Sequence, residues 1–317
     1  MGHKSKLSEG KKMFISVMVI FFIYAVIFIL FEDYDRTHLM PFDEASDWHL
    51  LLFSLFVMTG LAFLLYRYAH NMDERISREQ AEKENIMRRE LTQNIAHELK
   101  TPVASILGFT ETILNTPDIS NADKDMFVNR THAQALRLKA LLQDISILNR
   151  MDYATELFKM ERVNVADIVA DIVTETATAI NSRNMKLRNC LPQSIIIHGN
   201  ISLLYSIFHN LIDNSINYAG KETTINMTAD EHTDCWQFTF SDNGIGIEEK
   251  HLPRIFERFY RIDKGRSRSL GGTGLGLSIV KNAVILHGGT ITAHPTTGGG
   301  LTFKFSLKKD NRSRYIP

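Results

Sequence analysis

Cysteine is scarce in this 317-residue sequence, and a net charge is absent. The two cysteines, Cys190 and Cys235, cannot form a disulfide framework and lack the spacing of metal ligands, so we interpret them as reduced thiols. Lysine and arginine together number 36, as do aspartate and glutamate, so the formal charge is zero. Nucleic-acid-binding proteins usually carry a basic surplus, and this balance therefore predicts no nucleic-acid partner.

Two widespread phosphate-binding signatures are also missing. The chain contains no GxxxxGKS or GxxxxGKT segment, which excludes a P-loop. Neither HRD nor DFG occurs, which excludes a protein kinase of the serine, threonine or tyrosine class. Any phosphate site in this chain must therefore use other residues.

Two long uncharged runs are present near the N-terminus. Residues 13–31 form a run of 19 residues and residues 50–66 a run of 17. As helices, both approach the length that crosses a hydrocarbon core of about 30 Å. No small-residue cleavage site follows the first run, which argues against a signal peptide, whereas a buried core helix remains the alternative for the second. We expect two transmembrane helices.

The charges beside these runs predict their orientation. Residues 1–12 carry a net charge of +3, and Arg67, Arg75 and Arg78 follow the second run. The intervening residues 32–49 carry −5. The positive-inside rule therefore puts both termini in the cytoplasm and leaves a short extracytoplasmic loop. This loop is too short to bury a core, which excludes a large external ligand-binding domain.

Residues 67–87 are rich in Glu, Arg and Lys and contain neither Pro nor Gly. We interpret them as a helical linker, either a weak dimeric coil or a plain solvated helix. From residue 88 onward, apolar residues recur every three or four positions, which is typical of an amphipathic helix. They are Leu91, Ile95, Leu99, Pro102, Ile106, Phe109 and Ile113.

A second helix is expected over residues 122–151, after a break at Asn115–Asp118. One face of it carries an apolar stripe. The stripe consists of Leu138, Leu141, Leu142, Ile145 and Leu148. A hairpin of two such helices covers both stripes well only by pairing with a second hairpin. Residues 88–153 therefore predict a dimeric four-helix bundle and a homodimer.

His97 lies off the apolar stripe of the first of these helices. At about 100° per residue it is far around the helix from Ile95 and Leu99, so it is expected to face solvent. Thr101 follows one turn later on the same face. Pro102 removes a helix amide, so we expect the helix to kink or loosen there. An exposed histidine is usually inert, so its importance depends on the motifs that follow.

From about residue 154 the pattern changes to alternating helices and strands, which predicts an α/β domain over residues 154–309 and a tail over 310–317. Helices are expected over 166–181 and 201–218, and strands over 194–197, 223–229, 235–241, 289–293 and 301–307. Within the second helix, Asn210, Asn214 and Asn217 share one polar face. Their amide oxygens suit a hard cation such as Mg²⁺, although a solvated face is the alternative.

Three further segments suggest an anion site. Asp242-Asn-Gly-Ile-Gly246 places a carboxylate beside backbone that a flat ligand can approach. Residues 250–268 carry a net charge of +5 with interleaved aromatic residues, as expected of a mobile basic segment over an anion. The glycine-rich segment 271–277 precedes a helix that reaches about Leu286, so its amides would point at phosphate.

Taken in order, these motifs resemble one family, the bacterial membrane-bound sensor histidine kinases of two-component systems. The resemblance covers about residues 88–309 and rests on five sequence boxes. They are the H box His97–Pro102, the N box Asn210–Asn217, the G1 box Asp242–Gly246, the F box Phe256–Phe259 and the G2 box Gly272–Gly276. Each box alone is weak, but five in the right order and spacing are not expected by chance.

The resemblance implies a multi-domain membrane protein. Its parts would be two transmembrane helices, a two-helix hairpin that dimerises as a four-helix bundle, and an α/β sandwich that binds ATP and Mg²⁺. Such a kinase phosphorylates its own histidine and passes the group to an aspartate of a response regulator, which it often also dephosphorylates. The implied location is the bacterial cytoplasmic membrane, with several passes and both termini inside.

The resemblance also implies roles for individual residues. His97 would accept the γ-phosphoryl group, Glu98 would withdraw the proton from the other ring nitrogen, and Thr101 would orient a water for dephosphorylation. Asn214 would ligate Mg²⁺, and Asp242 would accept a hydrogen bond from the adenine amino group. The other implied nucleotide contacts are Asn210, Asn217, Tyr218, Gly244, Gly246, Phe259, Arg261, Gly272, Thr273, Gly274, Leu275 and Gly276.

Two departures from the family pattern are visible. The family often has lysine where Asn217 stands, so Lys264, Arg266 or Arg268 would have to supply the missing phosphate cation. About 30 residues separate the second run from the H box, which is too short for the common relay module. The signal is therefore expected to pass directly from the second span into the bundle.

Two other functions remain open. An ATPase of the same nucleotide fold, as in gyrase or mismatch-repair proteins, would lack the H box and the two spans. A non-catalytic membrane scaffold with a decayed kinase would bind nucleotide without phosphorylation, and Asn217 is the feature that favours it.

Overall fold

The computed structural model describes three stretches of the chain and four single residues before them. These are residues 45–153, 158–262 and 272–310, with residues 22, 23, 26 and 29. The chain divides into two compact units, Met1–Arg88 and Arg89–Pro317. Apart from the four single residues, the expected first span lies outside the described residues, as do the N-terminal segment 1–12 and residues 311–317 of the tail.

The first unit contains the beginning of α2, a 71-residue helix that runs from Ala45 to Asn115. The last residues of the expected loop, 45–49, are therefore helical, and the expected linker belongs to the same helix. Within α2, Leu52–Glu82 is long and apolar enough to cross a membrane, with a mean hydropathy of 1.6 in its most apolar window. The described residues thus hold one candidate membrane helix, whereas the sequence predicts two.

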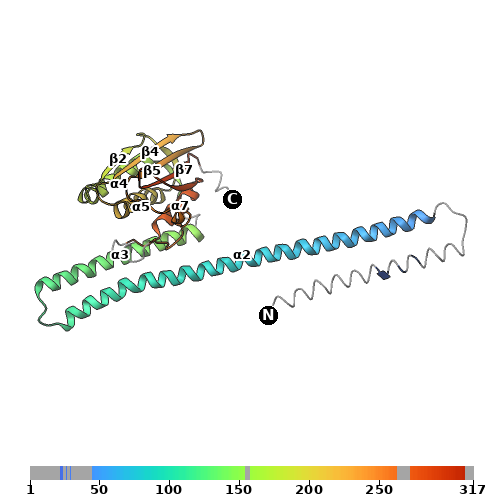
Figure 1. The fold of residues 1–317 in the computed structure, drawn as a ribbon, viewed down its shortest axis with the longest axis horizontal. Helices are drawn as coiled ribbons and strands as arrows, with labels where there is room; N and C mark the ends of the chain where they lie inside the picture. The colour runs from blue at the N-terminus through green and yellow to red at the C-terminus, as the bar shows by residue number, and fades with distance from the viewer. Residues whose placement is uncertain are drawn as a thin grey trace. The chain divides into compact units, whose positions relative to one another are not determined.

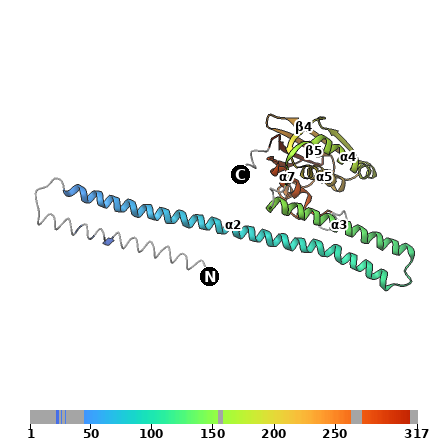
Figure 2. The same cartoon turned by 180° about the vertical axis from the view of Figure 1, so that it is seen from behind.

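In the second unit, the end of α2 and helix α3 (Asn121–Tyr153) form the expected hairpin (Figures 1 and 2). The hydroxyl of Ser120 accepts a hydrogen bond from the Asp123 amide at 3.1 Å and so caps α3. Pro102 is buried with the apolar stripe, and α2 continues through it as a helix. The hairpin therefore places one apolar face of each helix inward.

The apolar stripe expected on α3 is only partly buried in the single chain. Leu141 and Leu148 are each 3% exposed and Ile145 is half-buried, whereas Leu142 is 52% exposed. Neighbouring helix residues lie about 100° apart, so Leu141 and Leu142 cannot both face the hairpin interior. Leu142 is therefore exposed in the single chain, and its burial in the expected four-helix bundle stays a prediction.

Residues 158–310 form a two-layer α/β domain (Figures 1 and 2). The main sheet has the strand order β2-β4-β5-β7-β6, in which β2 and β4 are parallel and the other neighbours antiparallel. Helices α4, α5 and α7 cover one face of it. The elements are β1 Glu161–Asn164, α4 Val165–Ser182, β2 Lys186–Cys190, β3 Ile196–Gly199, α5 Ile201–Tyr218, β4 Thr224–Glu231, β5 Cys235–Asp242, the short 3-10 helix Glu249–His251, α7 Gly276–Leu286, β6 Ile291–Pro295 and β7 Leu301–Lys308.

All five expected strands are present as β3 to β7, but the sequence pattern missed β1 and β2. β1 is four residues long and pairs antiparallel with β3 in a separate small sheet. β2 is a polar edge strand in which only Leu187 is partly buried. Neither strand has the apolar alternation on which the prediction depends, so tertiary pairing alone makes them strands.

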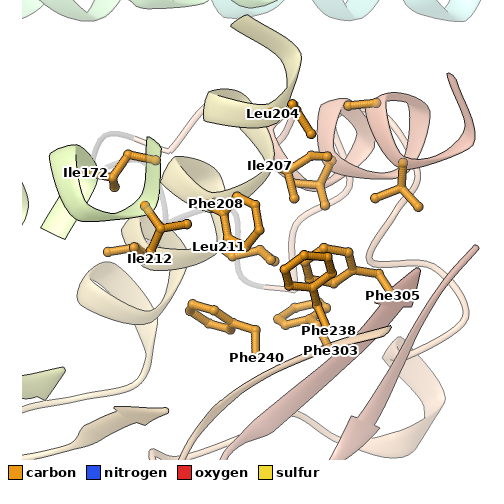
Figure 3. Packing of buried hydrophobic residues seen from close by; sticks show 14 of the residues in the cluster. Ile172, Leu204, Ile207, Phe208, Leu211, Ile212, Phe238, Phe240, Phe303 and Phe305 are labelled. Atoms are coloured by element: carbon orange, nitrogen blue, oxygen red, sulfur yellow. The ribbon is translucent and has the colours of Figure 1, made fainter. Parts of the chain in front are cut away.

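Aromatic residues of the sheet form the core beneath α5, as Figure 3 shows. Phe208 on α5 meets Phe238 on β5 and Phe305 on β7 edge-on, with ring centroids 5.4 and 5.7 Å apart. Phe238 and Phe305 stack at 5.0 Å. Truncating a buried phenylalanine typically costs about 3–5 kcal/mol, so this cluster holds α5 firmly on the sheet.

His287 is fully buried just after α7 and ties this helix end to the start of α5. Its Nε2 accepts a hydrogen bond from the Asn200 amide at 3.1 Å, and its Nδ1 lies 2.7 Å from the Ala283 carbonyl oxygen. Because an amide can only donate, Nε2 carries no proton and Nδ1–H donates to Ala283. Burial lowers the pKa of His287, and the bond to Ala283 offsets this only in part.

We expect the protein to lose stability as the pH falls below the ordinary histidine pKa of 6.5. The folded state resists protonation of His287 and the unfolded chain does not, so the stabilisation is complete above that pKa and declines below it. Urea midpoints measured between pH 7 and pH 5 check this. His287→Gln, which keeps an acceptor but does not titrate, should show a smaller decline, and an equal decline would contradict the assignment.

Candidate functional site

Asp242 lies at the end of β5 on the side that faces the core. Buried and partly exposed residues alternate along β5, and Asp242 continues the buried set at 6% exposure. A buried carboxylate needs hydrogen-bond donors. Its Oδ1 accepts from the amides of Gly244 and Leu301 at 3.0 and 3.3 Å, and its Oδ2 accepts from the Ser215 hydroxyl at 2.9 Å.

The turn after β5 brings its backbone against the end of α5. The Ile245 amide donates to the Ala219 carbonyl oxygen at 3.0 Å, and a Cβ on Gly244 would collide with the Ala219 backbone. Gly246 has a φ of 65° and packs against the Gly300 backbone. Glycine at these two positions therefore allows the turn to pack closely against α5 and against the backbone before β7.

The three expected asparagines lie on one partly exposed face of α5. Asn210 packs against the start of α7, where a Cβ on Gly276 would lie 2.5 Å from its Oδ1. The Asn217 side chain hydrogen-bonds to Asp213, one turn earlier on the same helix. Asn217, which stands where the family often has lysine, is thus paired with a carboxylate, and Asn214 lies between the other two.

The glycine-rich segment Gly272–Gly276 leads directly into the N-terminus of α7. Gly274 has a φ of 75°, and a Cβ there would lie 3.0 Å from the Phe259 Cα. The Phe259 amide donates to the Gly274 carbonyl oxygen at 2.8 Å. Leu275 is fully buried, and its amide donates to the Thr273 hydroxyl at 3.2 Å. The segment therefore presents amides and a helix N-terminus rather than side chains.

Arg261 lies beside this glycine-rich segment with a side chain only 6% exposed. Its guanidinium donates to the Gly272 carbonyl oxygen and, at 3.3 Å, to Glu98. Within the described residues its Nε has no hydrogen-bond partner. The Tyr218 hydroxyl also packs against Gly272. A nearly buried cation with a free N–H is suited to an anionic ligand.

Glu98 links the helical hairpin to this region. Its Oε2 lies 3.3 Å from Arg261 and 3.6 Å from Arg137 on α3, so two guanidinium groups neutralise it. The adjacent His97 is exposed, as the sequence predicts. Thr101 is also exposed, and its hydroxyl donates to the His97 carbonyl oxygen at 3.4 Å. The structure therefore brings Glu98 and Arg261 together and leaves His97 accessible.

Two further polar contacts join α3 to the α/β domain. Arg258 binds Asp152 through two hydrogen bonds of 2.8 and 2.7 Å. The Thr273 hydroxyl donates to Asp144 at 3.0 Å, and burial raises the pKa of that carboxyl, an effect the Thr273 bond partly offsets. Sequence reasoning missed both aspartates and Arg137, because polar residues on one helix give no signal of what they meet in another domain.

The basic segment is described only up to Ile262. Its cations Lys264, Arg266 and Arg268 lie outside the described residues. In the part of the chain that the structure describes, no group of three or more His, Cys, Asp or Glu side chains could hold a metal. An Mg²⁺ ion near Asn214 would therefore take most of its oxygen ligands from water or a phosphate.

Together these residues fit a nucleoside triphosphate. Asp242 offers a buried acceptor for an amino group on a base. Arg261 and the α7 N-terminus offer charge and amides to phosphates. These groups are therefore complementary to the base and to the phosphates of ATP.

Family comparisons agree with this division of the chain. Residues 87–154 match the His Kinase A (phospho-acceptor) domain, and residues 199–311 match the histidine kinase-, DNA gyrase B-, and HSP90-like ATPase domain. The two matches together cover more than half of the chain. The first of them is the part that a gyrase-type ATPase would lack.

Curated relatives include the sensor-like histidine kinase SenX3 of Mycobacterium tuberculosis, 33% identical over 220 residues, which are 69% of this chain and 53% of the relative. The phosphate regulon sensor protein PhoR of Pseudomonas aeruginosa is 33% identical over 219 residues, covering 68% and 49%. The chain thus spans about half the length of the curated relatives it matches.

Solved structures share the fold. The histidine kinase AdeS of Acinetobacter baumannii aligns at a TM-score of 0.55 and 19% identity, over 68% of this chain and 98% of that one. The histidine kinase ThkA, solved in complex with the response regulator protein TrrA, aligns at 0.56 and 19% identity, over 69% and 61%.

The hairpin and the α/β domain therefore define a protein in which a phospho-acceptor domain precedes an ATPase domain. The chain belongs to the bacterial two-component sensor histidine kinases.

A double-mutant cycle on Arg258 and Asp152 tests the contact between the hairpin and the α/β domain. Both side chains are less than one-third exposed and form a bidentate pair, so we expect a coupling of about 1 kcal/mol in urea unfolding. The more exposed pair Arg254 and Glu257 serves as the control, with a coupling of about 0.5 kcal/mol or less. Additive effects of Arg258→Ala and Asp152→Ala would contradict the contact.

Proposed function

We propose that this chain uses ATP to phosphorylate itself on His97 and transfers the phosphoryl group to an aspartate of a response regulator. The observation that carries this proposal is the ion pair between Glu98, beside the exposed His97, and Arg261, beside the glycine-rich segment. This ion pair joins the helical hairpin to the α/β domain, and both belong to the same compact unit. The relatives named as sensor kinases support the same activity.

In this proposal the α/β domain binds the nucleotide at both ends. Asp242 accepts a hydrogen bond from the adenine amino group, while Gly244 and Gly246 let the base approach. Asn214 would hold Mg²⁺, which would neutralise phosphate charge, and Asn210 lies one turn earlier on the same helix. The phosphates lie along Gly272–Gly276, with Tyr218, Phe259, Arg261 and Asn217 around them. Phosphoryl transfer depends mainly on such positioning and charge neutralisation.

The transfer step forms a bond between a ring nitrogen of His97 and the γ-phosphorus, and breaks the bond from that phosphorus to the leaving oxygen of ADP. The proton on the other ring nitrogen passes to Glu98. Since Arg261 binds Glu98 in the described arrangement, both residues have to change partners before transfer. Arg261 would then pair with the phosphates, which supplies the cation that Asn217 does not.

We also infer a phosphatase activity toward the phosphorylated response regulator. Thr101 lies one turn after His97, and both are exposed. A hydroxyl in that position is able to orient a water toward a phosphoryl group on the partner. This role is carried over from the family by position.

Incubation with γ-labelled ATP tests the proposed kinase. The full chain should acquire an acid-labile, base-stable phosphate that His97→Gln abolishes, because no other group is proposed to accept it. His132→Gln, which replaces another exposed histidine of the same hairpin, should label normally. Full labelling of the His97→Gln protein would overturn the proposal, and rapid transfer to one receiver domain of the host would identify the partner.

We propose further that the chain is a homodimer in the bacterial cytoplasmic membrane, with two spans at residues 13–31 and 50–66 and both termini inside. The candidate membrane helix in α2 supports the second span. Exposed apolar residues on the hairpin, such as Val103, Leu107 and Leu142, suit pairing with a second copy. Helix α2 continues into the hairpin, so a signal needs no separate relay module.

Thiol labelling of intact cells checks this topology. In a variant with both native cysteines replaced by serine, Thr37→Cys in the loop should react with a membrane-impermeant maleimide. Ser8→Cys and Ser313→Cys should react only after lysis, because both termini are expected inside. Labelling of either terminus in intact cells, or protection of the loop, would rule out the two-span arrangement.

A further inference from the structure

Ser215 is a polar residue on the apolar face of α5. It is 3% exposed and belongs to the row of α5 residues that pack on the sheet, next to Leu211, Ile212 and Ile216. A buried hydroxyl needs a hydrogen-bond partner. The Ser215 hydroxyl donates to Oδ2 of Asp242 at 2.9 Å, across the interface between the helix and the sheet. The contact therefore connects α5 directly to the carboxylate at the end of β5.

The hydrogen bonds to Asp242 are shared unequally between its two oxygens. Oδ1 accepts from two amides, those of Gly244 and Leu301, whereas Oδ2 accepts from Ser215. A carboxylate oxygen has two lone pairs, so Oδ1 is saturated and Oδ2 keeps one lone pair free. Oδ2 is therefore the oxygen that can accept from a ligand, and Ser215 holds that same oxygen.

We propose that Ser215 is a positioning residue that sets base selectivity by fixing Oδ2 of Asp242. The proposal rests on the proposed function, in which Asp242 accepts from the adenine amino group. Guanine carries a carbonyl oxygen at that position, which offers no hydrogen to the carboxylate and is repelled by it. Discrimination then depends on the orientation of Oδ2, and the Ser215 hydroxyl restrains its rotation.

The surroundings of Asp242 explain why one hydroxyl matters here. The carboxylate is 6% exposed, so water is poorly placed to replace a lost donor. Both other donors are backbone amides on Oδ1, and neither holds Oδ2. In Ser215→Ala, Oδ2 loses its only protein donor among the described residues, while the helix and its apolar neighbours are left in place.

The test measures nucleotide affinity of the full chain in detergent, by competition with a fluorescent nucleotide. The competitors are ATP, GTP and purine riboside triphosphate, which lacks the amino group. Ser215→Ala should lower the affinity for ATP by about fivefold to tenfold and that for the amino-free analogue by less than about twofold. The matched control is Ser206→Ala on the same helix, whose hydroxyl donates to the Ser202 carbonyl oxygen one turn earlier. This variant should keep the wild-type ratio of the affinities for ATP and the amino-free analogue.

Two conservative variants guard against a folding artefact. Ser215→Thr keeps the hydroxyl and should keep the preference for ATP over the amino-free analogue. Ser215→Cys keeps the size with a weaker donor and should lose part of the preference. The inference would be overturned if Ser215→Ala left the ratio of the affinities for ATP and the amino-free analogue unchanged, or if it lost affinity equally for all three nucleotides. If the wild type prefers ATP but is not labelled on His97, the proposed kinase activity would be wrong, and the inference about Ser215 would stand.

Discussion

The packing of α5 on the five-stranded sheet is the constraint on which the site depends. Phe208 on the helix interlocks with Phe238 and Phe305 on the strands, and this contact leaves little freedom for either layer. The polar face of α5 and the end of β5 are thereby held together. Asp242 is buried at that junction, and its donors come from a helix, a turn and a strand. The apolar core thus fixes the positions of the polar residues of the site.

Polar contacts join the hairpin to the α/β domain, beside apolar residues of both parts such as Leu148 and Phe259. Arg261 meets Glu98, Arg258 meets Asp152, and the G2 segment meets α3 through a hydroxyl bond to a carboxylate. Contacts of this kind are weaker than an apolar core and exchange partners readily. They suit a boundary that has to rearrange, because Glu98 and Arg261 are both assigned to the transfer step and cannot perform it while bound to each other.

Much of the fold could be predicted from periodicity. The bounds of α5 follow from its apolar spacing, and strands β4, β5 and β7 follow from their alternation. The short β1 and the polar edge strand β2 could not, because their pairing partners and not their own residues make them strands.

The sequence by itself determined the family, the order of the domains and the candidate chemistry, because those depend on which residue types follow one another at fixed spacings. Only the tertiary structure decided which residues share a contact. Ser215 reaches Asp242 across 27 positions, His287 reaches the amide of Asn200, and Arg261 reaches Glu98. No pattern along the chain reveals such pairs, because burying a polar group costs free energy unless it finds a hydrogen-bond partner, and here the partner comes from another element.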